Sequence, residues 1–174
     1  RTVGGSTTIN SGTCFRVPDR VLAKWRNDMG LGEFTPEHLA PYYDRAEQLY
    51  GVHGEVGGDP TEGPRGPYPF PPVPHARVVG EIVERLRRLG LHPSALPLGL
   101  QPNCVLCNTC NSFPCRIHAK SDAEVCGIKP AMAQRNVELW TNARARRLRT
   151  NAGGTRVESV EVERAGEIVR VSAP

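Results

Sequence analysis

Four cysteines lie close together in the second half of the chain and could bind a metal ion or a cluster through their sulfurs. They are Cys104, Cys107, Cys110 and Cys115, with the spacing C-x2-C-x2-C-x4-C. This run is similar to the ferredoxin pattern C-x2-C-x2-C-x3-C-P, but it has one extra residue, and Pro114 precedes the last cysteine instead of following it.

Three interpretations of these cysteines stay open. Their thiolates could hold an iron–sulfur cluster, and three of them would suffice for a three-iron cluster. They could bind structural zinc with His118 as an extra ligand, although zinc sites usually separate two C-x2-C pairs by a longer loop. They could also be reduced thiols or a disulfide that support an irregular loop, which is the interpretation we favour.

A second segment that could bind a ligand is the glycine loop, residues 4–13, within the opening stretch RTVGGSTTINSGTCFR. Glycines let backbone N–H groups approach a polar ligand closely, and Ser and Thr hydroxyls can donate hydrogen bonds to it. Taken alone, the Gly-Gly-Ser-Thr start is equally typical of a surface turn.

The longer stretch is more specific, because Gly4 to Asn10 continues into Ser-Gly-Thr-Cys-Phe-Arg. It resembles the flavin-proximal motif of the glucose–methanol–choline (GMC) oxidoreductases, Gly-Gly-Ser-Ser/Thr-x-x-Asn followed by small residues and an aromatic residue or Arg-Pro. Residues 33–43 and 135–148 resemble later family segments in the right order: a Thr-Pro-Glu helix start followed by tyrosines, and the strand that passes under the adenine.

The resemblance implies FAD as the cofactor and gives individual residues a role. Gly4 and Gly5 would let the backbone approach the diphosphate and the flavin, and Ser6 and Thr7 would donate hydrogen bonds to ribityl or phosphate oxygens. Four further residues would lie beside the isoalloxazine ring: Asn10, Ser11, Gly12 and Thr13. The backbone of Ala145 would pair with the adenine edge.

The resemblance also implies an enzyme that oxidises an alcohol or sugar hydroxyl by hydride transfer to the flavin. Its electrons would pass to oxygen, or to an acceptor protein or quinone. The family's Gly-x-Gly-x-x-Gly fingerprint belongs upstream of Arg1 and its catalytic His downstream of Pro174, so we expect an internal fragment without a catalytic residue, inactive and free of flavin by itself. Some family dehydrogenases carry an iron–sulfur cluster in this region, so the alternative is a cysteine-based electron-transfer or metal-binding module.

The elements that would position these residues belong to an α+β fold, a partial FAD-binding domain of α/β type. We divide it into the flavin-binding loop (1–18), helices and a Pro/Gly-rich loop (19–100), a Cys-rich segment (101–134) and a small β-sheet (135–174). The stretch 51–74 holds seven of the chain's 16 prolines, and we interpret it as a long ordered loop, with a flexible linker as the alternative.

Helix signals are clearest in three places. Asp19 could cap a helix through Trp25, and Thr35 followed by Pro36 opens a second helix that ends by Gly51. Residues 75–89 have an apolar period typical of an amphipathic helix. A further stretch, 119–133, is expected to be largely helical.

Strands are expected at the end of the chain. The run 137–140 suggests a short strand, and 143–150 suggests another. Val157 to Val162 and Ile168 to Val171 suggest a hairpin across Ala165 and Gly166.

Composition excludes several classes of partner. The 174 residues include 22 basic and 18 acidic ones, a mild excess of positive charge without a basic face that alternates with aromatics, so we expect no nucleic acid binding. The sequence contains no run of 18 apolar residues, so it predicts no membrane span. The clustered cysteines and the lack of an export signal favour a cytoplasmic location.

Overall fold

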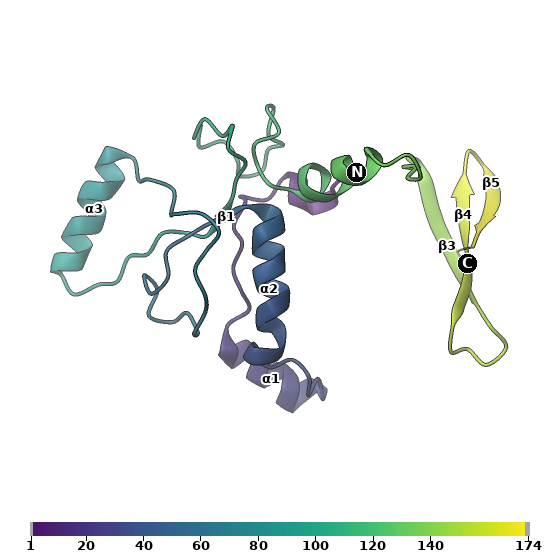
Figure 1. Ribbon diagram of the computed structural model, residues 1–174, viewed down its shortest axis with the longest axis horizontal. Helices are drawn as coiled ribbons and strands as arrows, with labels where there is room; N and C mark the ends of the chain where they lie inside the picture. Colours follow the sequence, from purple (N-terminus) through teal and green to yellow (C-terminus); the bar gives the residue numbers. More distant parts are fainter. Residues whose placement is uncertain (1, 173–174) are drawn as a thin grey trace. The chain divides into compact units, whose positions relative to one another are not determined.

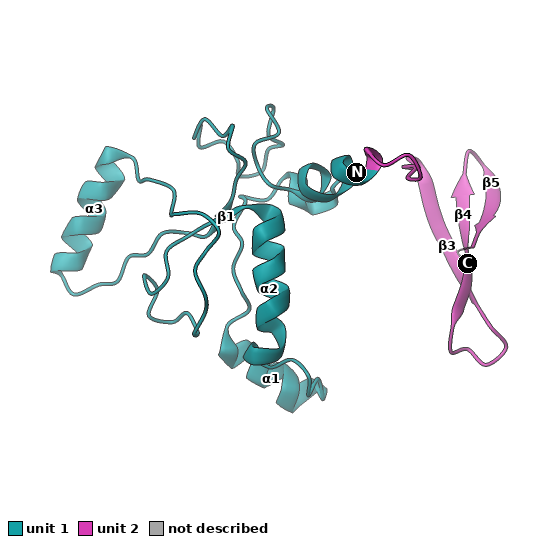
Figure 2. Ribbon diagram, in the orientation of Figure 1, with its two compact units in different colours: residues 1–131 teal, residues 132–174 magenta. Residues whose placement is uncertain are grey.

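The computed structural model describes residues 2–172, which form helices and small antiparallel sheets (Figure 1). This is the mixed α+β fold that the sequence predicts. The chain divides into two compact units, shown in different colours in Figure 2. Unit 1 ends at Ala131, and unit 2 begins at Met132.

Unit 1 contains most of the helices, joined by long irregular segments. Its elements in chain order are the 3-10 turn η1 (Gly5–Thr8), α1 (Asp19–Met29), α2 (Pro36–Tyr50), β1 (Val52–His53), α3 (Arg77–Arg88), β2 (Leu98–Gly99), the π-helical turn η2 (Glu124–Ile128) and α4 (Lys129–Met132), which includes the unit boundary. No helix among residues 2–172 combines the length and apolar character that a membrane span needs.

The second helix begins and ends as its sequence predicts. The Thr35 hydroxyl accepts a hydrogen bond from the backbone N–H of His38 at 3.1 Å, which satisfies one donor of the first turn. Gly51 ends the helix with a φ of 57°, a left-handed conformation that favours glycine. In α1 the prediction differs by one position: Asp19 is the first helical residue, and Pro18 precedes it without a side-chain cap.

The fourth helical region is shorter than predicted. Residues 119–121 are not helical, because the backbone of Lys120 forms a β-bridge with Leu100 and the Ser121 N–H donates to the Gly99 carbonyl at 3.0 Å. The helix starts only after Asp122, whose carboxylate accepts from the Val125 N–H at 2.9 Å.

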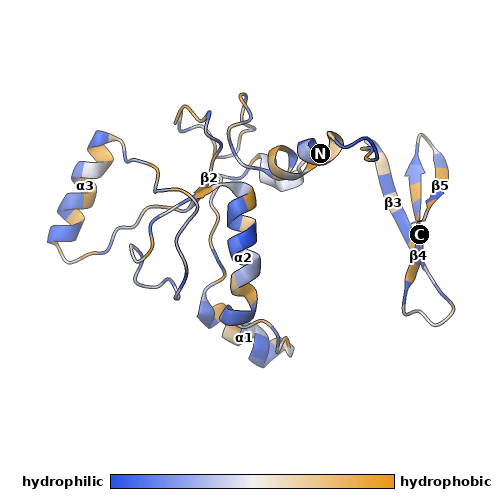
Figure 3. Cartoon of the chain, viewed as in Figure 1, coloured by the Kyte–Doolittle hydropathy of each residue, from blue (hydrophilic) through white to orange (hydrophobic). Residues whose placement is uncertain are grey.

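A short set of extended strands forms the centre of unit 1. β1 and β2 pair antiparallel, Thr13 forms a bridge with Leu98, and Leu100 forms its bridge with Lys120. The few fully buried apolar side chains include Leu22 and Val52. Apolar and polar bands follow one another along α3 in Figure 3. Most of its large apolar side chains are exposed in this chain: Val83 is buried, whereas Val78 and Ile82 are exposed.

Unit 2 is a three-stranded antiparallel sheet in the order β3 (Ala143–Thr150), β4 (Val157–Arg164), β5 (Glu167–Val171). The predicted hairpin is confirmed: Ala165 and Gly166 have φ values of 52° and 84°, as a tight turn between twisted strands requires. The prediction of a strand over 137–140 is wrong. A short apolar run becomes a strand only where a neighbour takes its hydrogen bonds, and strand pairing here starts at Ala143.

Candidate functional site

The glycine loop starts with two glycines in the left-handed region, at φ values of 82° for Gly4 and 60° for Gly5. A Cβ atom on Gly4 would lie 2.8 Å from the Thr8 hydroxyl oxygen and 3.2 Å from the backbone N of Glu124, so no side chain fits there. A Cβ on Gly5 would meet nothing within 4 Å. Gly4 is therefore required by packing inside the protein, whereas Gly5 has open space on the side where a Cβ atom would lie.

The hydroxyl groups of this loop also fall into two kinds, those bonded within the protein and one that is exposed. Thr7 donates its hydroxyl hydrogen to the Gly4 carbonyl at 2.6 Å and accepts from the Ala123 N–H at 3.0 Å. Thr8 donates to the Val3 carbonyl at 3.0 Å. Ser6, in contrast, is exposed. The two threonines thus shape the loop from inside, and Ser6 offers the hydroxyl that faces outward.

The second half of the loop is held by its own polar groups. The Gly12 N–H donates to the side-chain oxygen of Asn10 at 3.0 Å, and the Ser11 and Thr13 hydroxyls lie 3.3 Å apart. The Gly12 carbonyl accepts from the Gly99 N–H at 2.9 Å, beside the bridge of Thr13 with Leu98. These bonds bring Asn10 to Thr13 together on the central strands.

Lys120 fixes the glycine loop from behind. Its side chain is 0% exposed, and its Nζ donates three hydrogen bonds, to the backbone carbonyls of Asn10 at 2.7 Å and of Cys110 and Phe113 at 2.9 Å each. Three bonds use every donor of an ammonium group. Sequence reasoning gave Lys120 no role, because lysine is rarely buried and its carbonyl partners lie far away in the chain.

The four predicted metal-ligand cysteines come from the cysteine loop, residues 103–118. They line one cavity of about 80 Å³, which Lys120 and Ser11 also line. Within residues 2–172, however, no three His, Cys, Asp or Glu side chains are arranged to hold a metal ion. The fold thus brings the four cysteines to one cavity, and all of them are free thiols.

The surroundings of these thiols shift their pKa values in different directions. Hydrogen bonds from the hydroxyl and the backbone of Thr109 lower the pKa of the exposed Cys107 thiol. Burial acts to raise the pKa of Cys115, but backbone N–H groups, including that of Ala119, outweigh it and lower this pKa. Burial raises the pKa of Cys110, although the charge of Lys120 opposes the shift.

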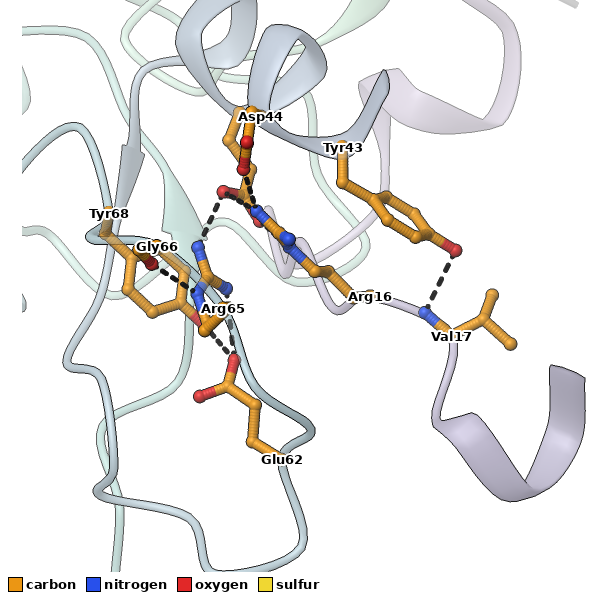
Figure 4. A network of polar contacts seen from close by, with 9 residues as sticks. Arg16, Val17, Tyr43, Asp44, Glu62, Arg65, Gly66 and Tyr68 are labelled. Atoms are coloured by element: carbon orange, nitrogen blue, oxygen red, sulfur yellow. Dashed lines mark hydrogen bonds and ion pairs between the residues drawn. The ribbon is translucent and has the colours of Figure 1, made fainter. Parts of the chain in front are cut away.

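A partly buried charge network connects α2 with the segment before α1 and with the Pro/Gly-rich loop; its two arginines, Arg16 and Arg65, are labelled in Figure 4. Glu47, on α2, binds Arg16 through both carboxylate oxygens at 2.8 Å and Arg65 at 2.6 Å. Arg16 also pairs with Asp44, and Arg65 with Glu62 at 3.0 Å. One carboxylate thus lies between two arginines that come from different loops.

Arg65 is the centre of the loop 51–74. Its side chain is only 1% exposed and lies 3.3 Å over the centre of the Tyr68 ring, a cation–π contact. The Tyr68 hydroxyl donates to Glu62 at 2.8 Å. Burial, together with this hydrogen bond, raises the pKa of Tyr68. The loop is therefore ordered, as the sequence predicts, and is tied to α2 through charge.

Ala145, the residue expected at the adenine, lies in unit 2. It is exposed on β3 and pairs with Val162 of β4, and the register shifts between Ala145 and Arg147. Such an irregularity bends a strand locally and changes which backbone groups are paired. Its role stays a prediction.

Comparison with known proteins gives the same family over almost the whole chain. A family model described as GMC oxidoreductase matches residues 1–173. An uncharacterized GMC-type oxidoreductase of Sinorhizobium fredii is 32% identical over 166 residues, which is 95% of this chain and 29% of the relative. The paromamine 6′-oxidase of Streptomyces fradiae is 37% identical over 163 residues, 84% of this chain and 28% of that enzyme.

A third relative extends the set to another genus. An uncharacterized GMC-type oxidoreductase of Mycobacterium tuberculosis is 29% identical over 157 residues, 88% of this chain and 22% of the relative. The chain therefore spans less than a third of the length of each curated relative that it matches.

Proposed function

Since the chain belongs to the GMC oxidoreductase family, we propose that it is part of an FAD-dependent enzyme that oxidises an alcohol or sugar hydroxyl by hydride transfer. The relative named paromamine 6′-oxidase supports oxidation of a small molecule. The electron acceptor in this proposal is oxygen, or an acceptor protein or quinone.

The observation that carries the proposal is the shape of the glycine loop. Gly5 has open backbone beside it and Ser6 is exposed, while Thr7, Thr8 and Lys120 hold the loop from inside. A polar loop that is fixed before its ligand arrives loses less conformational entropy on binding. These features fit the phosphate and ribityl groups of a flavin nucleotide.

In the proposed complex, each part of the chain has a separate task. The backbone at Gly4 and Gly5 would approach the diphosphate, and Ser6 would donate a hydrogen bond to it. The backbone from Asn10 to Thr13 would orient the isoalloxazine ring and stabilise negative charge on it. The strand at Ala145 would bind the adenine. When bound, FAD supplies the acceptor for the substrate's hydride.

The cysteine loop supports a narrower alternative, in which an iron–sulfur cluster or another metal group carries electrons away from the flavin. The convergence of Cys104, Cys107, Cys110 and Cys115 on one cavity supports it. Against it stands the finding that, in residues 2–172, the ligand arrangement for a metal ion is not formed. We therefore keep the flavin enzyme as the proposal and the metal group as the alternative.

The test is spectroscopic and uses the whole protein that contains this chain. We expect an absorbance maximum at roughly 450 nm, a property of oxidised flavin, and its bleaching by a substrate found among alcohols and sugars. Ser6→Ala should weaken flavin binding, whereas Ser94→Ala, at an exposed position outside both loops, should leave it unchanged. Purified protein that neither contains nor takes up flavin would refute the proposal. Iron analysis of the same sample decides the alternative.

A further inference from the structure

Lys120 is a buried cation whose partners are dipoles. Its side chain has no solvent exposure, and all three hydrogen bonds of its ammonium group go to backbone carbonyls. A buried charge is normally paired with an opposite charge, because removing it from water is costly. Carbonyl dipoles solvate the ammonium but do not cancel its charge, so Lys120 carries a fixed positive charge into the interior.

The position of this charge connects two loops. The Asn10 carbonyl belongs to the glycine loop, and the carbonyls of Cys110 and Phe113 belong to the cysteine loop. Within residues 2–172, one backbone–backbone hydrogen bond also connects these two loops, from the Ser112 N–H to the Ile9 carbonyl at 2.9 Å. Lys120 therefore connects the two loops through hydrogen bonds from one ammonium group.

The stem of Lys120 also supports the glycine loop directly. An added Cβ on Gly12 would lie 3.7 Å from the Cγ atom of Lys120, which places the lysine stem against the backbone at Gly12. The ammonium group then holds the carbonyl two residues earlier, at Asn10. The lysine thus contacts the stretch proposed to lie beside the isoalloxazine ring at two points, by its apolar stem and by its charge.

We propose that Lys120 is a positioning residue for the flavin, which holds the Asn10–Thr13 backbone in its binding shape and supplies a fixed positive charge that favours the reduced cofactor. This inference rests on the proposed function. Reduction adds negative charge to the flavin, and a nearby buried cation stabilises that charge because the protein interior screens it weakly. Removing the cation therefore lowers the reduction potential.

The experiment compares three variants of the full-length holoenzyme. Lys120→Met keeps the length of the side chain but removes its charge and donors, Lys120→Arg keeps the charge, and Lys24→Met removes an exposed lysine of α1 as the control. We expect Lys120→Met to reduce the equilibrium constant for two-electron reduction at least tenfold, about 30 mV in potential. Lys120→Arg should stay within twofold of the unchanged protein, and so should Lys24→Met.

A second measurement covers a variant that loses its flavin. Amide hydrogen exchange of the flavin-free proteins should be faster in Lys120→Met than in Lys24→Met at Gly99 and Ser112, the residues whose N–H groups bind the glycine loop. A flavin-containing Lys120→Met with an unchanged potential overturns the proposal, and so does a flavin-free one with unchanged exchange. If the unchanged protein binds no flavin, the proposed function fails, while the exchange comparison still tests the hold of Lys120 on the loop.

Discussion

Two irregular loops of unit 1 are each fixed by one buried cation, and the two cations are compensated in different ways. Arg65 fixes residues 51–74 through the carboxylates of Glu47 and Glu62. Lys120 fixes the cysteine loop through backbone carbonyls. Carboxylates cancel the charge of Arg65, whereas carbonyl dipoles leave the charge of Lys120 in place.

Because their charges are compensated differently, Arg65 can serve only to hold its loop, whereas Lys120 can also exert an electrostatic effect on a ligand. A guanidinium between carboxylates has little charge left to influence anything nearby, and it holds its loop by geometry. An uncancelled ammonium behind the glycine loop has the same holding role and adds an electrostatic one. The predictions below test whether the two loops differ in this way, in the order of expected effect.

The largest effect should come from Glu47→Gln. This change leaves the half-buried Arg16 and the buried side chain of Arg65 facing an amide, which destabilises the local structure by roughly 3 kcal/mol, the range for removing one partner of a buried ion pair. Hydrogen exchange at the Phe70 N–H, which binds the Val52 carbonyl, measures the opening of this region. Asp28→Asn, in the exposed pair with Lys24, is the control and should cost less than about 0.5 kcal/mol. If Glu47→Gln and Asp28→Asn destabilise the protein equally, burial of the Glu47 network does not increase its contribution to stability.

The next effect should come from Lys120→Met. Three carbonyls lose a charged donor, but the desolvation of an ammonium group is also avoided, so we expect a smaller net loss of about 2 kcal/mol. Hydrogen exchange at Ser112 reports it, because the Ser112 N–H binds the glycine loop. The exchange at Phe70 should not change. A loss that spreads to Phe70 would mean that the two loops do not respond separately.

A third change sets the scale for an ordinary local interaction. Thr35→Ala removes the cap of α2, the helix that carries Glu47, and should cost about 1 kcal/mol. Urea unfolding of the whole protein measures it, with Thr35→Ser as the variant that keeps the cap. If Thr35→Ala destabilises the protein more than Glu47→Gln, the charge network is not the main support of this region.

The smallest effect concerns reactivity instead of stability. The lowered pKa of Cys107 means that its thiolate forms at a lower pH than that of an ordinary thiol, whereas the raised pKa of Cys110 delays its thiolate to a higher pH. At pH 8, iodoacetamide should therefore label Cys107 before Cys110, as mass spectrometry can follow. Labelling of both at equal rates would contradict the unequal pKa values, and protection of both would indicate that they bind a metal or form disulfides.

What the sequence predicts correctly is what neighbouring residues determine. The cap at Thr35, the stop at Gly51 and the hairpin turn at Ala165 depend on residues within a few positions of each other. The failures involve distant partners. The helix predicted from residue 119 starts later because Lys120 pairs with Leu100, and the strand predicted over 137–140 has no paired neighbour.

The candidate site divides along the same line. The glycine loop can be proposed as a site from its own residues, since glycine and hydroxyl residues occur in it at the spacing of the family motif; its binding role stays a prediction. The two buried cations are not, because Arg65 pairs with Glu47 across 18 positions and Lys120 binds Asn10 across 110. Arginine and lysine in polar segments are usually exposed, so nothing local marks these two as buried.

The separation of 110 residues between Asn10 and Lys120 has a consequence for the synthesis of the protein. The ribosome adds Lys120, the lysine that holds the glycine loop in shape, on the order of ten seconds after it adds Asn10, at 5–20 residues per second. Until then, Gly4 to Thr13 lack the support of Lys120, and the proposed flavin-binding surface is incomplete. Cofactor loading should therefore begin only after Lys120 has left the exit tunnel.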